Sequence, residues 1–135
     1  MQPTAHRLRK SGLRATSSRL ALFAVLERSG KPMSIQAIHQ KLRSAQVDRV
    51  TVYRMTEDLK TAGLLRQVDL GHSHVHYEIN DPNHHHHHLV CDNCGRVQDV
   101  PVKNEAQLMS NIEKRHQFRM RDHAMEFFGL CYSCK

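Results

Sequence analysis

The sequence contains no tryptophan, and aromatic residues make up only 5% of its 135 residues. That length is enough for one ordinary domain or two very small ones, and hydrophobic residues account for 39% of it. A small second lobe would have a thin apolar core. We therefore expect such a lobe to need a further source of stability, either a bound metal ion or a partner subunit.

Long hydrophobic runs are also missing. The longest apolar run covers residues 20–26, which is far shorter than the roughly 20 residues of a membrane-spanning helix. The first residues are basic but lack the apolar core of a secretory signal. We therefore expect a cytoplasmic protein with no membrane partner. In that compartment, four cysteines are better explained as metal ligands than as disulfides.

Acidic residues are scarce in the first half of the chain. Residues 1–66 contain only Glu27, Asp48, Glu57 and Asp58 as acidic groups, and the whole chain has a formal net charge of +7. A basic half of this kind fits a polyanionic partner such as nucleic acid. A basic surface that serves only solubility is the alternative at this point.

Three helices are predicted in that basic half. Thr16 and Ser34 are suitable N-caps for the first two, the first of them running to about Glu27, and either Asp48 or Thr51 opens the third. The third helix has an apolar stripe at helical spacing, and Gly63 stands where a residue of left-handed conformation ends a helix. Its stripe consists of Val52, Met55 and Leu59.

A hairpin is predicted to follow, with strands at residues 64–69 and 75–79. Three helices and a two-stranded ribbon, in this order, are typical of a winged helix, whose third helix enters the major groove of DNA. The turn-forming residues 80–83 mark a boundary. We predict a DNA-binding domain over 1–80, a hinge over 81–83 and a second domain over 84–135.

The second half reads as a small α/β domain, so the predicted fold class is α+β. Strands are expected at residues 84–90 and 96–100, with a last strand inside 118–130. Between them, a helix from Glu105 to about His116 would turn Leu108 and Ile112 inward.

Two Cys-x-x-Cys pairs occur in this second half. Each pair can hold a tetrahedral ion from a tight turn, and together they supply the four thiolates of a closed structural zinc site. One pair alone would be compatible with redox chemistry, but two complementary pairs favour zinc. The pairs are Cys91 with Cys94 and Cys131 with Cys134.

Five consecutive histidines occupy residues 84–88. Successive side chains of a strand point to opposite faces. His84, His86 and His88 would then share one face, and His85 and His87 the other. One short strand can thus serve two metal sites, although a solvated tract without function is the alternative.

Several further residues could complete such sites. Imidazole suits zinc, iron, nickel or copper, and added carboxylates shift the preference toward harder ions. The hairpin also carries three histidines at alternate positions, which either join a site or are exposed loop residues. The candidate carboxylates are Glu78, Asp99 and Glu105, His123 is a further imidazole, and the hairpin histidines are His72, His74 and His76.

These residues resemble the ferric uptake regulator family over nearly the whole chain. The segment 84–97, His-rich and containing Cys-x-x-Cys-Gly, is similar to the family signature, and 51–54 (Thr-Val-Tyr-Arg) resembles its recognition-helix motif. Residues 12–16 with Arg19 are similar to its N-terminal segment, and the closing cysteine pair matches too. The resemblance implies a homodimeric, metal-activated transcriptional repressor that binds palindromic operators and controls iron or zinc uptake.

The resemblance also implies two further metal sites. The hinge sensory site would use Glu78, His86 and His88, with Asp99 nearby, and the second site of the dimerisation domain would use His85, His87, Glu105 and His123. One ligand of the iron sensors is missing, because its position falls at Pro32 or Met33. His72, His74, His76 or Asp69 could replace it. The sensed metal is expected to be Fe²⁺ or Zn²⁺, with Mn²⁺ also compatible.

Six residues are candidates for operator contact. Arg49 is the best candidate to read a base, and Tyr53 could stack on a thymine methyl or bond a phosphate. The alternatives are a solvated helix face for each arginine and a packed core ring for Tyr53. The set is Arg14, Arg19, Arg49, Thr51, Tyr53 and Arg54.

Other functions explain less of the sequence. A metal-buffering or delivery protein would account for the histidines but not for the basic winged helix. A peroxide-sensing regulator of the same family is compatible with Glu78 and Asp99. We expect no enzyme and no small-molecule substrate, because the sequence shows no nucleophile–base constellation.

Overall fold

The computed structural model describes residues 3–71 and 74–135. The chain divides into two compact units, Met1–Pro82 and Asn83–Lys135. Within the described residues no helix is long and apolar enough to cross a bilayer.

The first unit contains four α-helices, α1 (Thr4–Lys10), α2 (Ser17–Ser29), α3 (Ile35–Lys41) and α4 (Arg49–Thr61), with a 3₁₀ turn η1 (Arg43–Ala45) between the last two. The three predicted helices are confirmed, and each begins at a predicted cap. The side chains of Thr16, Ser34 and Asp48 accept hydrogen bonds from the backbone N–H groups three residues further on.

Helix α4 ends at the predicted glycine. Gly63 has φ +77°, and its N–H donates to the carbonyl of Lys60 at 2.9 Å, while the N–H of Leu64 donates to the carbonyl of Leu59 at 2.9 Å. This pair of hydrogen bonds is a Schellman motif. It satisfies the last carbonyls of α4 and turns the chain directly into the next strand.

A three-stranded antiparallel sheet follows, formed by β1 (Met33–Ser34), β2 (Leu65–Val68) and β3 (His76–Ile79) in the order β1-β3-β2. The hairpin of β2 and β3 is the predicted wing. Strand β1 and helix α1 were not predicted. A two-residue strand carries no periodicity, and α1 buries only Leu8 among basic residues, so neither has an apolar pattern.

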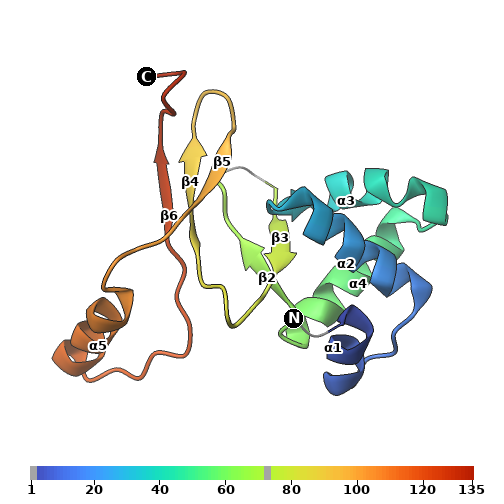
Figure 1. Ribbon diagram of the computed structural model, residues 1–135, viewed down its shortest axis with the longest axis horizontal. Coiled ribbons are helices and arrows are strands. Elements are labelled where there is room, and N and C mark those ends of the chain that lie inside the picture. The colour runs from blue at the N-terminus through green and yellow to red at the C-terminus, as the bar shows by residue number, and fades with distance from the viewer. Residues whose placement is uncertain (1–2, 72–73) are drawn as a thin grey trace. The chain divides into compact units, whose positions relative to one another are not determined.

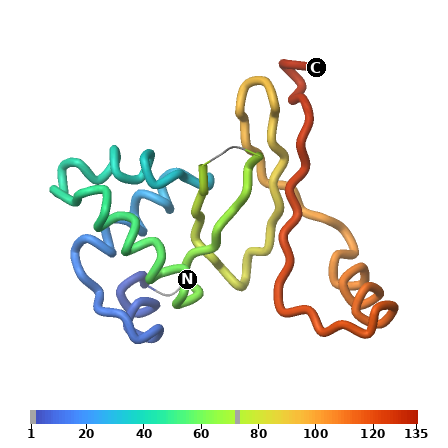
Figure 2. Tube along the Cα trace, turned by 180° about the vertical axis from the view of Figure 1, so that it is seen from behind, coloured from blue at the N-terminus to red at the C-terminus, as the bar shows by residue number. Residues whose placement is uncertain are grey.

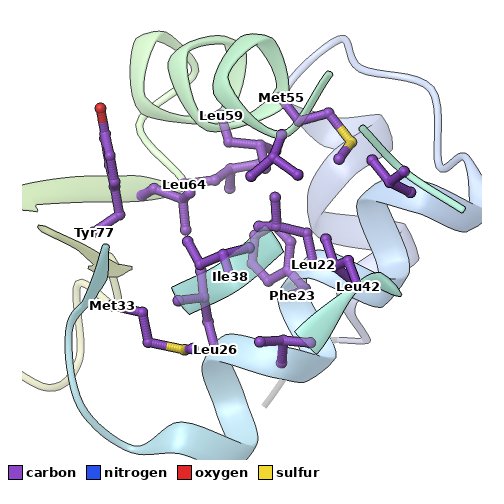
Figure 3. Packing of buried hydrophobic residues seen from close by; sticks show 14 of the residues in the cluster. Leu22, Phe23, Leu26, Met33, Ile38, Leu42, Met55, Leu59, Leu64 and Tyr77 are labelled. Atoms are coloured by element: carbon purple, nitrogen blue, oxygen red, sulfur yellow. The ribbon is translucent and has the colours of Figure 1, made fainter. Parts of the chain in front are cut away.

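The core of the first unit lies where the helices meet the sheet (Figure 3). Leu22 and Phe23 of α2 pack against Ile38 of α3 and Leu59 of α4, and all four are fully buried. Tyr77 of β3 closes one side of this cluster. The apolar stripe predicted for α4 faces this core, so the opposite face of α4 is exposed.

The second unit contains β4 (His87–Cys91), β5 (Val97–Val100), α5 (Glu105–His116) and β6 (Glu126–Gly129). Its sheet has the order β5-β4-β6, with β4 antiparallel to β5 and parallel to β6 (Figure 1). Helix α5 stands at one end of this sheet and does not lie across its face (Figure 2).

Two expectations for this unit were wrong. The histidine strand begins at His87, three residues later than predicted, so His84 is an exposed residue outside the strand. Leu108 and Ile112 of α5 do not face inward, since they are 44% and 38% exposed. No described element of this unit packs across α5, so its apolar residues have no covering layer within this unit.

Candidate metal centres

The four cysteines converge at one end of the second sheet. Cys91 ends β4, and Cys131 follows β6, which lies parallel to β4, so the two Cys-x-x-Cys turns meet. The four Sγ atoms lie within 4.8 Å of one another, and none of the four cysteines forms a disulfide. The sulfurs of Cys94 and Cys131 are 3.7 Å apart.

The backbone favours the thiolate form of Cys91. Hydrogen bonds from the N–H groups of Cys94 and Cys131 lower the pKa of the Cys91 thiol. The backbone nitrogen of Cys131 lies 3.3 Å from Sγ of Cys91. Gly95, with φ +75°, permits the tight turn after Cys94. Four sulfurs with no oxygen or nitrogen donor among them fit a structural zinc ion, which prefers four tetrahedral thiolates.

A second cluster forms around Glu105 at the start of α5. His87 on β4, His85 just before that strand and His123 before β6 bring their ligand atoms within 4.8 Å of one another and of the carboxylate. The Nε2 atoms of His85 and His87 lie 2.9 and 2.5 Å from Oε1 of Glu105, and Nε2 of His123 contacts the same oxygen.

The protonation of Glu105 suits metal binding. Burial opposes its ionisation, but hydrogen bonds from His87 and His123 outweigh burial and lower the pKa of Glu105 to about 2. The carboxylate is therefore charged at neutral pH. Three imidazoles and one carboxylate fit zinc or another first-row divalent ion. Glu105 also connects α5 to residues 84–88, the histidine segment.

The opposite face of the histidine segment holds His86 and His88, whose rings are 5.1 Å apart. The alternation predicted from strand geometry therefore holds for residues 85–88. His88 is fully buried. Nε2 of His86 lies 3.9 Å from Oδ1 of Asp99 on β5, and Nδ1 of His88 lies 3.3 Å from Oε1 of Glu126 on β6.

Glu126 was not among the predicted site residues. Its position next to His88 depends on the parallel pairing of β4 with β6, which places His88 directly opposite Glu126. No local pattern in the sequence encodes that pairing. An acidic residue within 118–130, the range in which the last strand was predicted, was the one available signal.

The remaining candidate ligands belong to the first unit. Glu78 is buried on β3 and forms an ion pair with Arg66 on β2, with Nε and Oε1 2.8 Å apart. His76 lies on β3, and its Nδ1 is 3.2 Å from the carbonyl oxygen of His74. His74 is an exposed residue. His72 lies outside the described residues. The predicted hinge set of Glu78, His86 and His88 stays a prediction.

The candidate DNA contacts group around α4. Arg49, Thr51, Tyr53 and Arg54 are all exposed on this helix, and Tyr53 is 54% exposed. The alternative of a packed core ring for Tyr53 is therefore wrong. Their exposure fits the stripe of α4, because these four residues lie off the buried positions Val52, Met55, Thr56 and Leu59.

Arg14 and Arg19 lie at the entrance to α2. One guanidinium nitrogen of Arg19 donates to the carbonyl of Arg14 at 2.9 Å, and the other lies 3.6 Å from the carboxylate of Asp58 on α4. Arg19 thus holds the start of α2 against α4. Its role in DNA contact stays a prediction.

Comparison with known proteins gives a consistent result. A sequence model of the ferric uptake regulator family matches residues 10–128. The chain is 31% identical over 134 residues to the ferric uptake regulation protein of Legionella pneumophila, covering 97% of this chain and 98% of that protein.

Solved structures of the same family share the fold. The ferric uptake regulator of Vibrio cholerae superposes with a TM-score of 0.79 at 25% identity, covering 96% of this chain and all of that one. The regulator of Helicobacter pylori, described as having three functional metal-binding sites, gives a TM-score of 0.77 at 25% identity, covering 96% and 87% of the two chains. The predicted α+β fold, a winged helix followed by a small α/β domain, is confirmed.

Proposed function

The chain belongs to the ferric uptake regulator family, and on that premise we propose that it is a metal-responsive DNA-binding repressor of metal-uptake genes. The observation that carries the proposal is the combination within one chain of a basic winged helix and histidine–carboxylate clusters. A metal-buffering protein would need the clusters but not the exposed basic face of α4.

The first unit is proposed to bind operator DNA with α4 in the major groove. Its capped N-terminus presents Arg49, Thr51 and Tyr53 to solvent, which suits contacts to base edges and phosphates. The wing of β2 and β3 would contact the adjacent backbone. The formal charge of +7 for the whole chain supports a polyanionic partner.

The second unit is proposed to form a homodimer, which would match palindromic operators. Apolar side chains are exposed on its strands, on α5 and in the segments that follow α5 and β6, and an excess of exposed apolar surface marks protein interfaces. A second copy would supply the layer that covers α5. The exposed residues are Leu89, Leu108, Ile112, Phe118, Phe127, Phe128, Leu130 and Tyr132.

Three metal sites are proposed. The four cysteines would hold a structural Zn²⁺. The sensed ion, Fe²⁺ or Zn²⁺ with Mn²⁺ also compatible, would be held by Glu78, His86 and His88, with Asp99 nearby. A second divalent ion would be held by His85, His87, Glu105 and His123. When bound, such an ion supplies coordination bonds and positive charge.

The switch is proposed to be a population shift. Because the proposed ligands come from both units, binding of the ion would favour the arrangements of the two units in which all of the ligands reach it. Those arrangements would be the ones that bind DNA. Imidazole and carboxylate ligands suit this role because they release an ion more readily than four thiolates do. The protein would therefore respond to the metal concentration while the structural Zn²⁺ stays bound to the four cysteines.

A gel-shift titration on a metal-uptake operator tests the proposal. The protein should bind with added Fe²⁺, Mn²⁺ or Zn²⁺ and release when the ion is chelated mildly, and the effective ion identifies the sensed metal. The double variant H86A/H88A should lose this metal response and keep its zinc and its dimer. The control H6A/H116A removes two exposed histidines outside the clusters and should respond as the wild type does.

Two results would contradict the proposal. Metal binding without any metal-dependent DNA binding would support a buffering protein instead. A normal metal response in H86A/H88A would show that these histidines do not form the sensory site, even if the protein is a repressor.

A further inference from the structure

Glu126 is held against His88 by the sheet of the second unit. The parallel register of β4 and β6 places the two residues directly opposite each other, and Oε1 of Glu126 lies 3.3 Å from Nδ1 of His88. The His88 side chain is fully buried, and that of Glu126 is 11% exposed. The contact is therefore largely shielded from water.

This contact restricts the tautomer of His88. A carboxylate only accepts hydrogen bonds, so the ring nitrogen that faces it must carry the proton. With the proton on Nδ1, the lone pair of the neutral ring is on Nε2. A histidine ligand whose second nitrogen donates to a carboxylate is fixed in orientation and is a more basic donor toward a metal ion.

We propose that Glu126 is a positioning residue that fixes His88 with its Nε2 lone pair presented to the sensed ion. The proposal rests on the sensory role of His88 proposed above. It assigns Glu126 no bond to the metal. Glu126 holds the imidazole ring of His88 in place. The Nε2 atom that binds the ion is therefore already oriented, and the ring needs no change of tautomer.

The other carboxylate next to His88 along the sheet is a poorer candidate for this role. Asp99 on β5 is also opposite His88 in register, but its side chain is 53% exposed. Water can compete for such an exposed carboxylate, so Glu126, which is 11% exposed, is the better orienting group.

A purely structural role for this contact is the alternative. In that case Glu126 would pin β6 to β4. The two strands are already joined by a ladder of four residue pairs from His88–Glu126 to Cys91–Gly129. The alternative predicts that replacing Glu126 changes stability without changing the tautomer of His88 or its metal affinity.

The test uses the full-length, zinc-loaded dimer and compares E126Q with E126L. Nitrogen-15 NMR of the histidine rings, with His88 assigned by its missing signals in H88N, reports the tautomer before sensory metal is added. Titration with Co²⁺ reports affinity and the visible spectrum of the site. In E126L the Nδ1–H tautomer of His88 should no longer predominate, and Co²⁺ binding should be weaker by about 10- to 100-fold.

E126Q retains an acceptor oxygen without the charge, so it should keep the tautomer and lose less affinity than E126L. The control E113L removes a carboxylate from α5, outside the metal clusters, and should match the wild type. Affinity in E126L within twofold of the wild type would overturn the proposal, and so would an unchanged tautomer. Circular dichroism and the dimer mass exclude misfolding as the cause of a loss.

H88A, measured alongside, separates two kinds of failure. If H88A loses Co²⁺ affinity and E126L does not, the orienting role of Glu126 is wrong while the sensory site stands. If H88A also keeps the wild-type affinity, the proposed sensory role of His88 is itself wrong.

Discussion

Tyr77 connects the wing to α4 through a chain of polar contacts. Its hydroxyl donates to Oε1 of Glu57 at 2.8 Å, Oε2 of Glu57 lies 3.1 Å from Nζ of Lys60, and Nζ of Lys60 donates to Gln67 on β2 at 3.1 Å. Burial, followed by the hydrogen bond to Glu57, raises the pKa of Tyr77 to about 12. The same hydrogen bond lowers the pKa of Glu57.

These shifts predict a pH dependence for Y77F. Between about pH 10 and pH 12 the unfolded wild-type chain loses the phenolic proton while the folded protein keeps it, so its free energy of unfolding falls as the pH rises. Y77F should lack this component. At pH 7 it should be about 0.5–1.5 kcal/mol less stable, because it lacks one hydrogen bond.

Urea denaturation at pH 7, 10 and 11 measures both effects. Y53F is the matched control, because Tyr53 lies on α4 and is 54% exposed. It should keep the wild-type stability and slope. Parallel curves for wild type and Y77F above pH 10 would contradict the raised pKa of Tyr77.

A second prediction concerns Arg54, which is exposed on α4. If it contacts a phosphate, R54A should weaken binding to specific and random duplexes alike and reduce the magnitude of the slope of log K against log salt by about 1. Fluorescence anisotropy at several salt concentrations measures this slope. R28A removes a charge that is also exposed, from α2, and should leave the slope unchanged. An unchanged slope in R54A would remove this residue from the interface.

The turn after α4 gives a prediction about helix termination. Gly63 has φ +77° and open space around the position of a Cβ atom, so G63A introduces backbone strain and no clash. We expect a loss of about 1–2 kcal/mol. G129A is the control, because its Cβ would also meet no atom and Gly129 is not among the residues of positive φ. Equal urea midpoints for the two variants would contradict this account.

Local signals predicted most of the first unit. Thr16, Ser34 and Asp48 act on backbone N–H groups three residues away, and the stripe of α4 repeats at helical spacing, so a short window contains the needed information. The same holds for the Cys-x-x-Cys turns. Helix α1 was missed because burial of the single residue Leu8 leaves no periodic pattern.

Non-local signals were not readable from the sequence. Alternation along the histidine segment predicted which imidazoles share a face, but the pairing that brings Glu126 to His88 joins residues distant in the chain. Leu108 and Ile112 were predicted to face inward because an apolar stripe indicates burial without naming the covering surface. Among the described residues of the second unit that surface is absent, and α5 buries no residue.

The two units differ in what stabilises them. Among the described residues of the second unit, the buried hydrophobic side chains are Val90 and Cys91, whereas the first unit has a continuous cluster. Free energy for folding the second unit must therefore come from metal binding and from association. Structural zinc contributes on the order of 10 kcal/mol in small domains.

Zinc removal should consequently unfold one unit and spare the other. A strong chelator with a thiol-alkylating reagent should dissociate the dimer and abolish the signal of the second sheet, while the helices of the first unit still melt cooperatively. Circular dichroism and native mass spectrometry measure both. A zinc-free protein that keeps its dimer and its full helix content would contradict the assignment of the cysteines.

The parallel pairing of β4 with β6 also has a consequence for biosynthesis. His88 and Glu126 are 38 positions apart, while the first unit closes on contacts made earlier in the chain. On a ribosome, we expect the winged helix to be complete while the nascent histidine segment and its first two cysteines still await the last strand. During that interval we expect these imidazoles and thiols to bind available divalent ions before either site is complete. Correct metallation should then depend on metal exchange after release as well as on the finished sites.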